Sequence, residues 1–261
     1  MTNPRNHWRR LVQAAALCLS LAACAGAQNA STQNAAADDP APQPSGWKAV
    51  LIAGDLQERA FDDAVNAMAD KLASYGVPRA NMTVLKASAI GPDAASRANV
   101  RTALTHLDPG RGEGCFVYVT SHGAKGRGLV IVSALMFLSP ADLDQMLVEG
   151  CGNHPTVVVA SGCYSGIFAE APLTAPNRVI LTAARPDRPS FGCNAQQEYT
   201  VFDRCVLQDV EAGLSWKAAM DRTRACVSKN EAELDVDAPS EPQLSIGADE
   251  RGLRVFARRA P

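Results

Sequence analysis

Two side chains able to take part in covalent chemistry stand at the ends of apolar runs. His122 follows the run Phe116–Ser121, and Cys163 follows the run Thr156–Gly162. Runs of β-branched and aromatic residues that end at a polar group beside glycine are typical of buried parallel strands, which deliver that group to the carboxyl edge of a sheet. We therefore expect the imidazole and the thiol to lie at one edge of one sheet.

A thiol and an imidazole placed together indicate nucleophilic catalysis. The thiolate is the reactive form of cysteine, and a histidine can take the thiol proton and return it to a departing amine. On this hypothesis Cys163 attacks a peptide carbonyl, a thioester acyl-enzyme forms, His122 protonates the leaving group, and water hydrolyses the thioester. The backbone N–H groups of Gly123 and Cys163 are the candidate oxyanion donors, and losing one such donor costs about 3 to 4 kcal/mol. This chemistry calls for no cofactor.

Each of these residues also has a structural interpretation. A cysteine at the end of an apolar strand is often a small buried hydrophobe, and an isolated histidine is often a hydrogen-bonded structural residue. His106 and His154 have no comparable context, and we interpret them as surface or core histidines. Cys151 is close to His154, but no second pair at ligand spacing follows, so we expect no metal site.

The elements that must position the pair alternate between strands and helices. Ser139 followed by Pro140 predicts the N-cap and first position of a helix. The alternation implies a mostly parallel central sheet with helices on both faces, which is a three-layer α/β/α sandwich. Apolar runs predict strands at 48–53, 81–86, 116–121, 156–162 and 178–184, and edge strands at 243–246 and 253–257. A short hairpin is predicted at 129–138. Helical periodicity predicts helices at 59–75, 96–107, 140–149 and 198–230, the last broken near Gly213.

The first 24 residues are typical of a signal peptide. Arginines precede an apolar stretch at residues 11–21 that is too short to span a bilayer as a stable helix. Leu21–Cys24 resembles a bacterial lipobox, in which Cys24 becomes the lipidated first residue of an outer-membrane lipoprotein facing the periplasm or cell surface. The alternative is cleavage after Ala25–Ala27, which would release a soluble periplasmic protein. Residues 25–46 are polar and predict a flexible linker, and the folded domain is expected at 47–261.

Composition narrows the classes of partner. The chain has 261 residues and a formal net charge of -2, with no basic stripe, which argues against binding to nucleic acid. An exported compartment permits disulfides. Setting aside Cys18, Cys24 and Cys163 leaves an odd number of cysteines, so at least one of them stays free. Sequence does not fix the pairing among Cys115, Cys151, Cys193, Cys205 and Cys226, although the last three are candidates for one bridge.

Four segments together resemble a known family. They are Phe116–Ala124, Ser139–Leu143, Ser161–Gly166 and Leu181–Pro186. In order and spacing they are similar to the legumain-like (C13) cysteine peptidases of the caspase-fold clan, and the resemblance covers most of residues 47–200. It implies a caspase-like fold, a hydrolase acting on protein or peptide substrates, and Cys163 and His122 as the catalytic dyad.

The resemblance also implies candidate substrate-binding residues. Arg59 matches the arginine of the family's first helix, Ser161 lies two positions before the nucleophile, and Ser190 stands where a pocket serine falls. Ala60 replaces the histidine expected beside that arginine, and Ser121 replaces the usual aspartate before the catalytic histidine. These differences argue against a direct transfer of the family's asparagine specificity.

Three functions follow from these patterns. The leading hypothesis is an exported cysteine-type endopeptidase. The second is a transpeptidase or ligase, in which an amine captures the same acyl-enzyme. The third is a catalytically silent caspase-like module that uses the cleft for binding. Labelling of Cys163 by an acyloxymethyl ketone distinguishes the third from the first two, and an added amine nucleophile distinguishes the second from the first.

Overall fold

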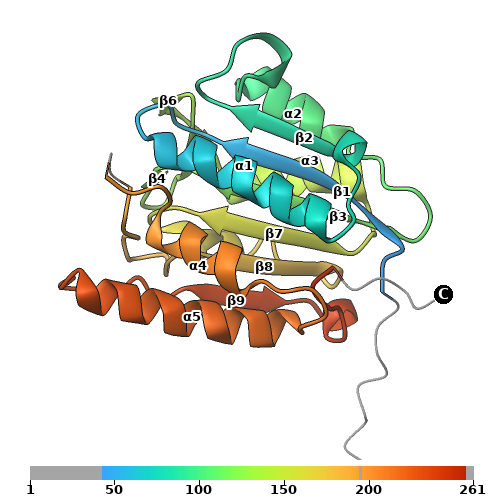
Figure 1. Cartoon of the computed structure of the whole chain (residues 1–261). Helices are drawn as coiled ribbons and strands as arrows, with labels where there is room; N and C mark the ends of the chain where they lie inside the picture. Colours follow the sequence, from blue (N-terminus) through green and yellow to red (C-terminus); the bar gives the residue numbers. More distant parts are fainter. Residues whose placement is uncertain (1–42, 194–195, 257–261) are drawn as a thin grey trace, which may run out of the picture. The chain divides into compact units, whose positions relative to one another are not determined.

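The computed structural model describes residues 43–193 and 196–256, and it shows a central sheet between two layers of helices (Figure 1). The sheet has the strand order β2-β1-β3-β7-β8-β9. All neighbouring strands are parallel except β9, which runs antiparallel to β8 at the edge. The strands are β1 (Gly46–Ala53), β2 (Met82–Lys86), β3 (Glu113–Thr120), β7 (Thr156–Ser161), β8 (Arg178–Thr182) and β9 (Gln243–Ile246).

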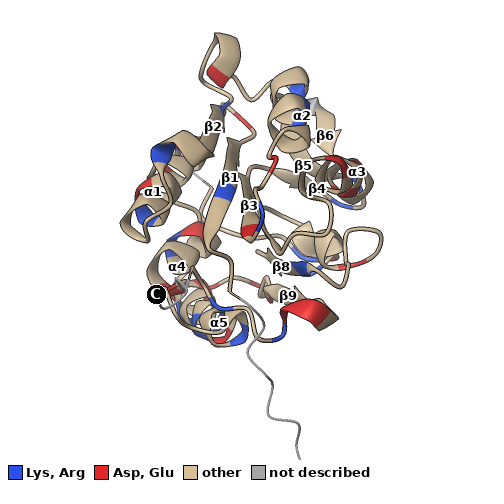
Figure 2. Ribbon diagram, turned by 90° about the vertical axis from the view of Figure 1, so that its right-hand side faces the viewer, with Lys and Arg blue, Asp and Glu red and all other residues tan. Residues whose placement is uncertain are grey.

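The helices divide between the two faces of the sheet, as the end-on view of Figure 2 shows. The first face is covered by α1 (Arg59–Ser74), α4 (Val201–Asp209) and α5 (Trp216–Glu233), and the second by α2 (Arg97–Thr105) and α3 (Pro140–Cys151). Short 3-10 turns occupy Arg79–Asn81, Gly91–Asp93, Ser165–Ala169 and Ala248–Glu250. The expected three-layer α/β/α sandwich is confirmed.

Alternation along the central strands explains why both faces are apolar. In β3, Phe116 and Tyr118 pack on the α1, α4 and α5 side, whereas Val117 and Val119 pack on the α2 and α3 side. Successive side chains of a strand point to opposite faces, so a continuous apolar run is what a sheet buried on both sides requires. The strand interpretation of these runs is therefore correct.

Two helix starts carry side-chain caps, and the cap at Ser139 is the one predicted from the sequence. The Ser139 hydroxyl accepts from the Asp142 N–H at 3.1 Å, and Pro140 occupies the first helical position of α3. The Ser96 hydroxyl likewise accepts from the Asn99 N–H at 3.1 Å at the start of α2. These bonds satisfy backbone donors that a helix leaves unpaired at its first turn.

A second, smaller sheet follows β3 directly. It consists of β4 (Gly123–Ala124), β5 (Gly128–Ile131) and β6 (Ser133–Leu138), paired antiparallel. The expected hairpin at 129–138 forms its last two strands. The Val130 N–H donates to the His122 carbonyl at 2.8 Å, and the Val132 N–H donates to the Gly54 carbonyl at 2.6 Å. The small sheet is thus attached to the carboxyl ends of β3 and β1.

The strand expected at 253–257 is wrong for the described residues 253–256. They form turns with a single antiparallel bridge between Arg254 and Ser215. The reason is that β9 already occupies the edge of β8, so these apolar residues are buried by packing instead. The Phe256 ring packs at 5.2 Å from the rings of Trp47 and Phe116.

The described residues contain two disulfides, one between the central sheet and a helix and one between two helices. Cys115 of β3 bonds to Cys151 at the end of α3, and Cys205 of α4 bonds to Cys226 of α5. Cys151 is therefore committed to sulfur rather than to a metal. The predicted signal peptide, Cys24 and most of the predicted linker lie outside the described residues. Within the described part no helix is long and apolar enough to cross a membrane.

Candidate active site

The carboxyl ends of β3 and β7 bring the two reactive segments together. Thr120 and Ser161 are paired in register, and the next residue, Ser121, donates its N–H to the Ser161 carbonyl at 3.0 Å. His122 and Cys163 therefore leave neighbouring strands at the same edge of the sheet, as the sequence predicts. Gly123 lies directly against the backbone of Cys163, so closely that a Cβ there would collide with it. Only glycine permits this approach.

His122 is held between α1 and the small sheet. Its ring meets the buried ring of Phe61 edge to face, with centroids 5.2 Å apart and planes at 89°. Its carbonyl is fixed by the bond from Val130. Within residues 43–193 and 196–256 no side chain hydrogen-bonds the imidazole, so aromatic packing rather than a carboxylate orients the ring.

Cys163 faces the loop between β8 and α4. Its Sγ lies 3.3 Å from the Ser190 backbone nitrogen, which donates to it, and 3.9 Å from the Ser190 hydroxyl. The same loop accepts the Tyr164 N–H at the Arg188 carbonyl, 2.8 Å away. The thiol is partly exposed and unpaired. The loop that follows β8 therefore contacts the sulfur of Cys163 through Ser190, the predicted pocket serine.

The backbone around Cys163 provides a candidate oxyanion donor. The Cys163 N–H makes no hydrogen bond within the described part of the chain, so it is available to a substrate oxygen. The Gly123 nitrogen lies in the crossing segment beside it, 3.6 Å from where a Cβ on Gly162 would stand. Two backbone N–H groups aimed at a developing negative charge are the usual oxyanion arrangement.

Comparison with known proteins agrees with this arrangement. Residues 95–213, which include both reactive segments, match the model of the Peptidase C13 family. The fold matches the crystal structure of caspase-1 from Spodoptera frugiperda with a TM-score of 0.60 at 13% identity, over 85% of this chain and 95% of that one. No curated protein matches by sequence. The chain therefore has a caspase-like fold, and its residues 95–213 are similar to the Peptidase C13 family.

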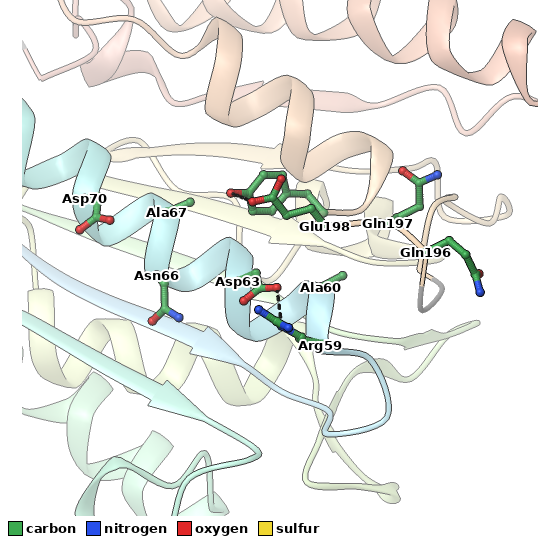
Figure 3. A pocket seen from close by; sticks show the side chains of 10 residues that line it. Arg59, Ala60, Asp63, Asn66, Ala67, Asp70, Gln196, Gln197 and Glu198 are labelled. Carbon is green, nitrogen blue, oxygen red and sulfur yellow. Dashed lines mark hydrogen bonds and ion pairs between the residues drawn. The ribbon is translucent and has the colours of Figure 1, made fainter.

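The three residues expected to bind substrate lie in different surroundings. Ser190 contacts the nucleophile. Ser161 is buried, 1% exposed, and its hydroxyl has no hydrogen-bond partner among the described residues. Arg59 is exposed at the start of α1 and turns back to Asp63, with Nε 3.0 Å from Oδ2, as Figure 3 shows.

The Arg59 side chain lines a groove that does not include Cys163. The groove has a volume of about 500 Å³ and runs along α1 opposite the segment before α4 (Figure 3). Asp63, Asp70 and Glu198 line it, and neither His122 nor Cys163 does. Among the described residues the Arg59 side chain forms an ion pair only with Asp63 of its own helix, so no contact there directs it at the nucleophile.

A buried carboxylate that the sequence did not predict as part of the site lies beneath it. Asp203 of α4 is fully buried and accepts hydrogen bonds from the hydroxyls of Tyr118 at 2.6 Å, Thr120 at 2.7 Å and Thr200 at 2.8 Å. Burial raises the pKa of Asp203, and the hydroxyl donors oppose that rise. Burial and the neighbouring Asp203 charge raise the pKa of Tyr118 well above its ordinary value. The spacing of Thr200 and Asp203 signals a helix cap in the sequence, but nothing there connects them with β3.

A second thiol lies near the nucleophile. Cys193 is unpaired and partly buried, three residues beyond Ser190 in the same loop. Burial raises the pKa of the Cys193 thiol, and the charge that Cys163 carries as a thiolate raises it further. Cys193 therefore favours the neutral thiol, which makes it a poor competitor for electrophiles aimed at Cys163.

Proposed function

We propose that this protein is a cysteine endopeptidase that uses Cys163 as nucleophile and His122 as general acid and base. The observation that carries the proposal is the close crossing of the two reactive segments, with Gly123 against the backbone of Cys163 at the carboxyl edge of paired strands. The family match, which includes both residues, and the caspase-like fold support the same chemistry.

The proposed reaction has two steps that use the same two side chains. Cys163 Sγ bonds to the carbonyl carbon of a peptide while its proton passes to His122, and the imidazole then gives that proton to the departing amine as the C–N bond breaks. Water, deprotonated by His122, next attacks the thioester and releases the carboxylate product and the free thiol. The Cys163 and Gly123 N–H groups stabilise the oxyanion in both steps.

We further propose that the enzyme acts outside the cytoplasm on protein or peptide substrates. The N-terminal signal pattern and Cys24 suggest export and a lipid anchor, with a soluble periplasmic form as the alternative. The pairing of Cys115 with Cys151 and of Cys205 with Cys226 supports an oxidising compartment, because structural disulfides persist there.

A peptide-library digest tests the activity and its preference together. The purified chain, Cys163→Ala, His122→Ala and the matched control Cys193→Ala are each incubated with the library, and products are identified by mass spectrometry. Cleavage by the wild type and Cys193→Ala, lost in the other two, is the expected result. Cleavage that survives Cys163→Ala contradicts the proposal. Products joined to an added amine, in place of hydrolysed ends, would assign the acyl-enzyme to transpeptidation.

A further inference from the structure

The fully buried carboxylate of Asp203 lies where the strands carrying the two reactive residues are paired. Tyr118 and Thr120, two residues apart on β3, point to the same face of the sheet and both donate to it. Ser161 of β7 is the registered partner of Thr120 and shares that face. Thr120 and Ser161 each stand two residues before a reactive side chain, His122 and Cys163 respectively.

The same carboxylate is bound into the start of α4. Thr200, the N-cap of that helix, donates its hydroxyl to Asp203 Oδ2 at 2.8 Å and accepts the Asp203 N–H at 3.1 Å. Oδ1 is used by Tyr118, and Oδ2 is shared between two threonine hydroxyls. All three hydroxyls donate to the carboxylate oxygens, so the orientation of each hydroxyl is fixed.

Ser161 completes the contact with β7. Its hydroxyl lies close enough to Asp203 to lower the carboxyl pKa, although it makes no hydrogen bond of acceptable geometry. The carboxylate of Asp203 on α4 is therefore bonded to two side chains of β3, and Ser161 at the end of β7 lies on the same face of the sheet. A buried network of this kind is rigid when its donors are satisfied, because each lost bond would leave a polar group without water.

We propose that Asp203 is a positioning residue for the proposed reaction, holding the ends of β3 and β7 in the register that places His122 beside Cys163. The role rests on the proposed function for its consequence in catalysis. It does not depend on contact with substrate, since Asp203 is fully buried.

A matched pair of amide substitutions tests this role. Asp203→Asn keeps the shape of the side chain but replaces one acceptor oxygen by a donor. Glu231→Gln makes the same chemical change in another buried carboxylate, on α5, where Glu231 accepts from the Ser240 N–H at 3.1 and 3.2 Å. Both variants are expected to lose stability because each weakens a buried hydrogen-bonded carboxylate, so only the role in positioning should separate them.

Two readouts are measured for each variant of the purified chain. The first is kcat and KM on a peptide found in the library digest. The second is the rate at which iodoacetamide alkylates Cys163, followed on the Cys163 peptide by mass spectrometry. Asp203→Asn is expected to lower kcat by about tenfold or more with little change in KM, and to slow alkylation toward the rate of His122→Ala. Glu231→Gln is expected to leave both within about twofold.

The outcomes separate this role from the proposed function. Asp203→Asn that folds and retains wild-type kcat and alkylation overturns the role. If Asp203→Asn fails to fold, Tyr118→Phe and Thr120→Val are measured instead, because each removes one hydrogen-bond donor and leaves the carboxylate in place. Unchanged kcat and alkylation rates in both variants overturn the role. If the wild type cleaves no peptide, the endopeptidase proposal fails, while slower alkylation in both Asp203→Asn and His122→Ala still supports the positioning role.

Discussion

Replacing Gly123 by alanine tests how closely the two reactive segments approach. The added methyl would stand 2.9 Å from the carbonyl carbon and 3.1 Å from the amide nitrogen of Cys163, and it would overlap the carbonyl oxygen. Ordinary contacts of this kind begin near 3.4 Å. To relieve the overlap with the carbonyl oxygen the segments must separate by about 1 Å, and a displacement of that size costs roughly 100-fold in rate. We expect kcat/KM to fall by about 100-fold, equivalent to about 2.7 kcal/mol.

The control for this substitution is Gly126→Ala in the same loop. Gly126 has φ +69°, so alanine there is strained by about 1 to 2 kcal/mol, but a Cβ would meet nothing within 4 Å. Both variants are assayed for peptide hydrolysis and for melting temperature. Gly126→Ala should lose stability and keep its activity. Gly123→Ala with more than half of the wild-type kcat/KM would refute the close crossing of the segments.

Three further predictions concern stability. Burial raises the pKa of the Glu250 carboxyl from 4.5 to about 7. Because the unfolded chain loses this proton at a lower pH than the folded chain, the melting temperature should fall as the pH rises from about 5 to about 8. Glu250→Gln should reduce this pH dependence in melting curves, and an unchanged pH dependence would contradict the prediction. Replacing Cys205 and Cys226 by alanine opens a loop of sequence separation 21 and should cost about 3 kcal/mol in urea unfolding, whereas a loss below about 1 kcal/mol would argue against the bridge. Asp144→Ala leaves the buried guanidinium of Arg178 without its carboxylate at 2.5 Å and should cost about 2 to 3 kcal/mol, so a variant as stable as the wild type counts against that pair.

The central strands and the convergence of the reactive segments were predictable from sequence. The apolar runs ending at Ser121 and Gly162 are continuous because both faces of the sheet are covered, and such runs identify buried parallel strands. Parallel strands of one sheet end at one edge, so two reactive residues that follow such strands can meet there. This is why His122 and Cys163 could be assigned to one edge without coordinates.

The remaining features depend on contacts between residues far apart in the chain. In the sequence, Asp203 has the position of an ordinary acidic residue in the first turn of a helix. Its hydrogen bond with Tyr118 of β3 depends on how the folded chain places α4. The apolar residues near Phe256 have the composition of a strand, but β9 already occupies the edge of the sheet beside β8, so they cannot pair there. Cysteine pairing is equally non-local, since Cys115 meets Cys151 only after α3 folds back on the sheet.

The most direct test of the account is covalent labelling of the nucleophile. The purified chain is treated with a peptidyl acyloxymethyl ketone, and the modified residue is located by mass spectrometry in the wild type and in His122→Ala. We expect modification at Cys163, with Cys193 spared, and a strong loss of labelling in His122→Ala. Labelling at Cys193 alone would contradict the assignment of Cys163 and His122 as a catalytic pair. Labelling of Cys163 at the same rate in His122→Ala and the wild type would contradict it as well.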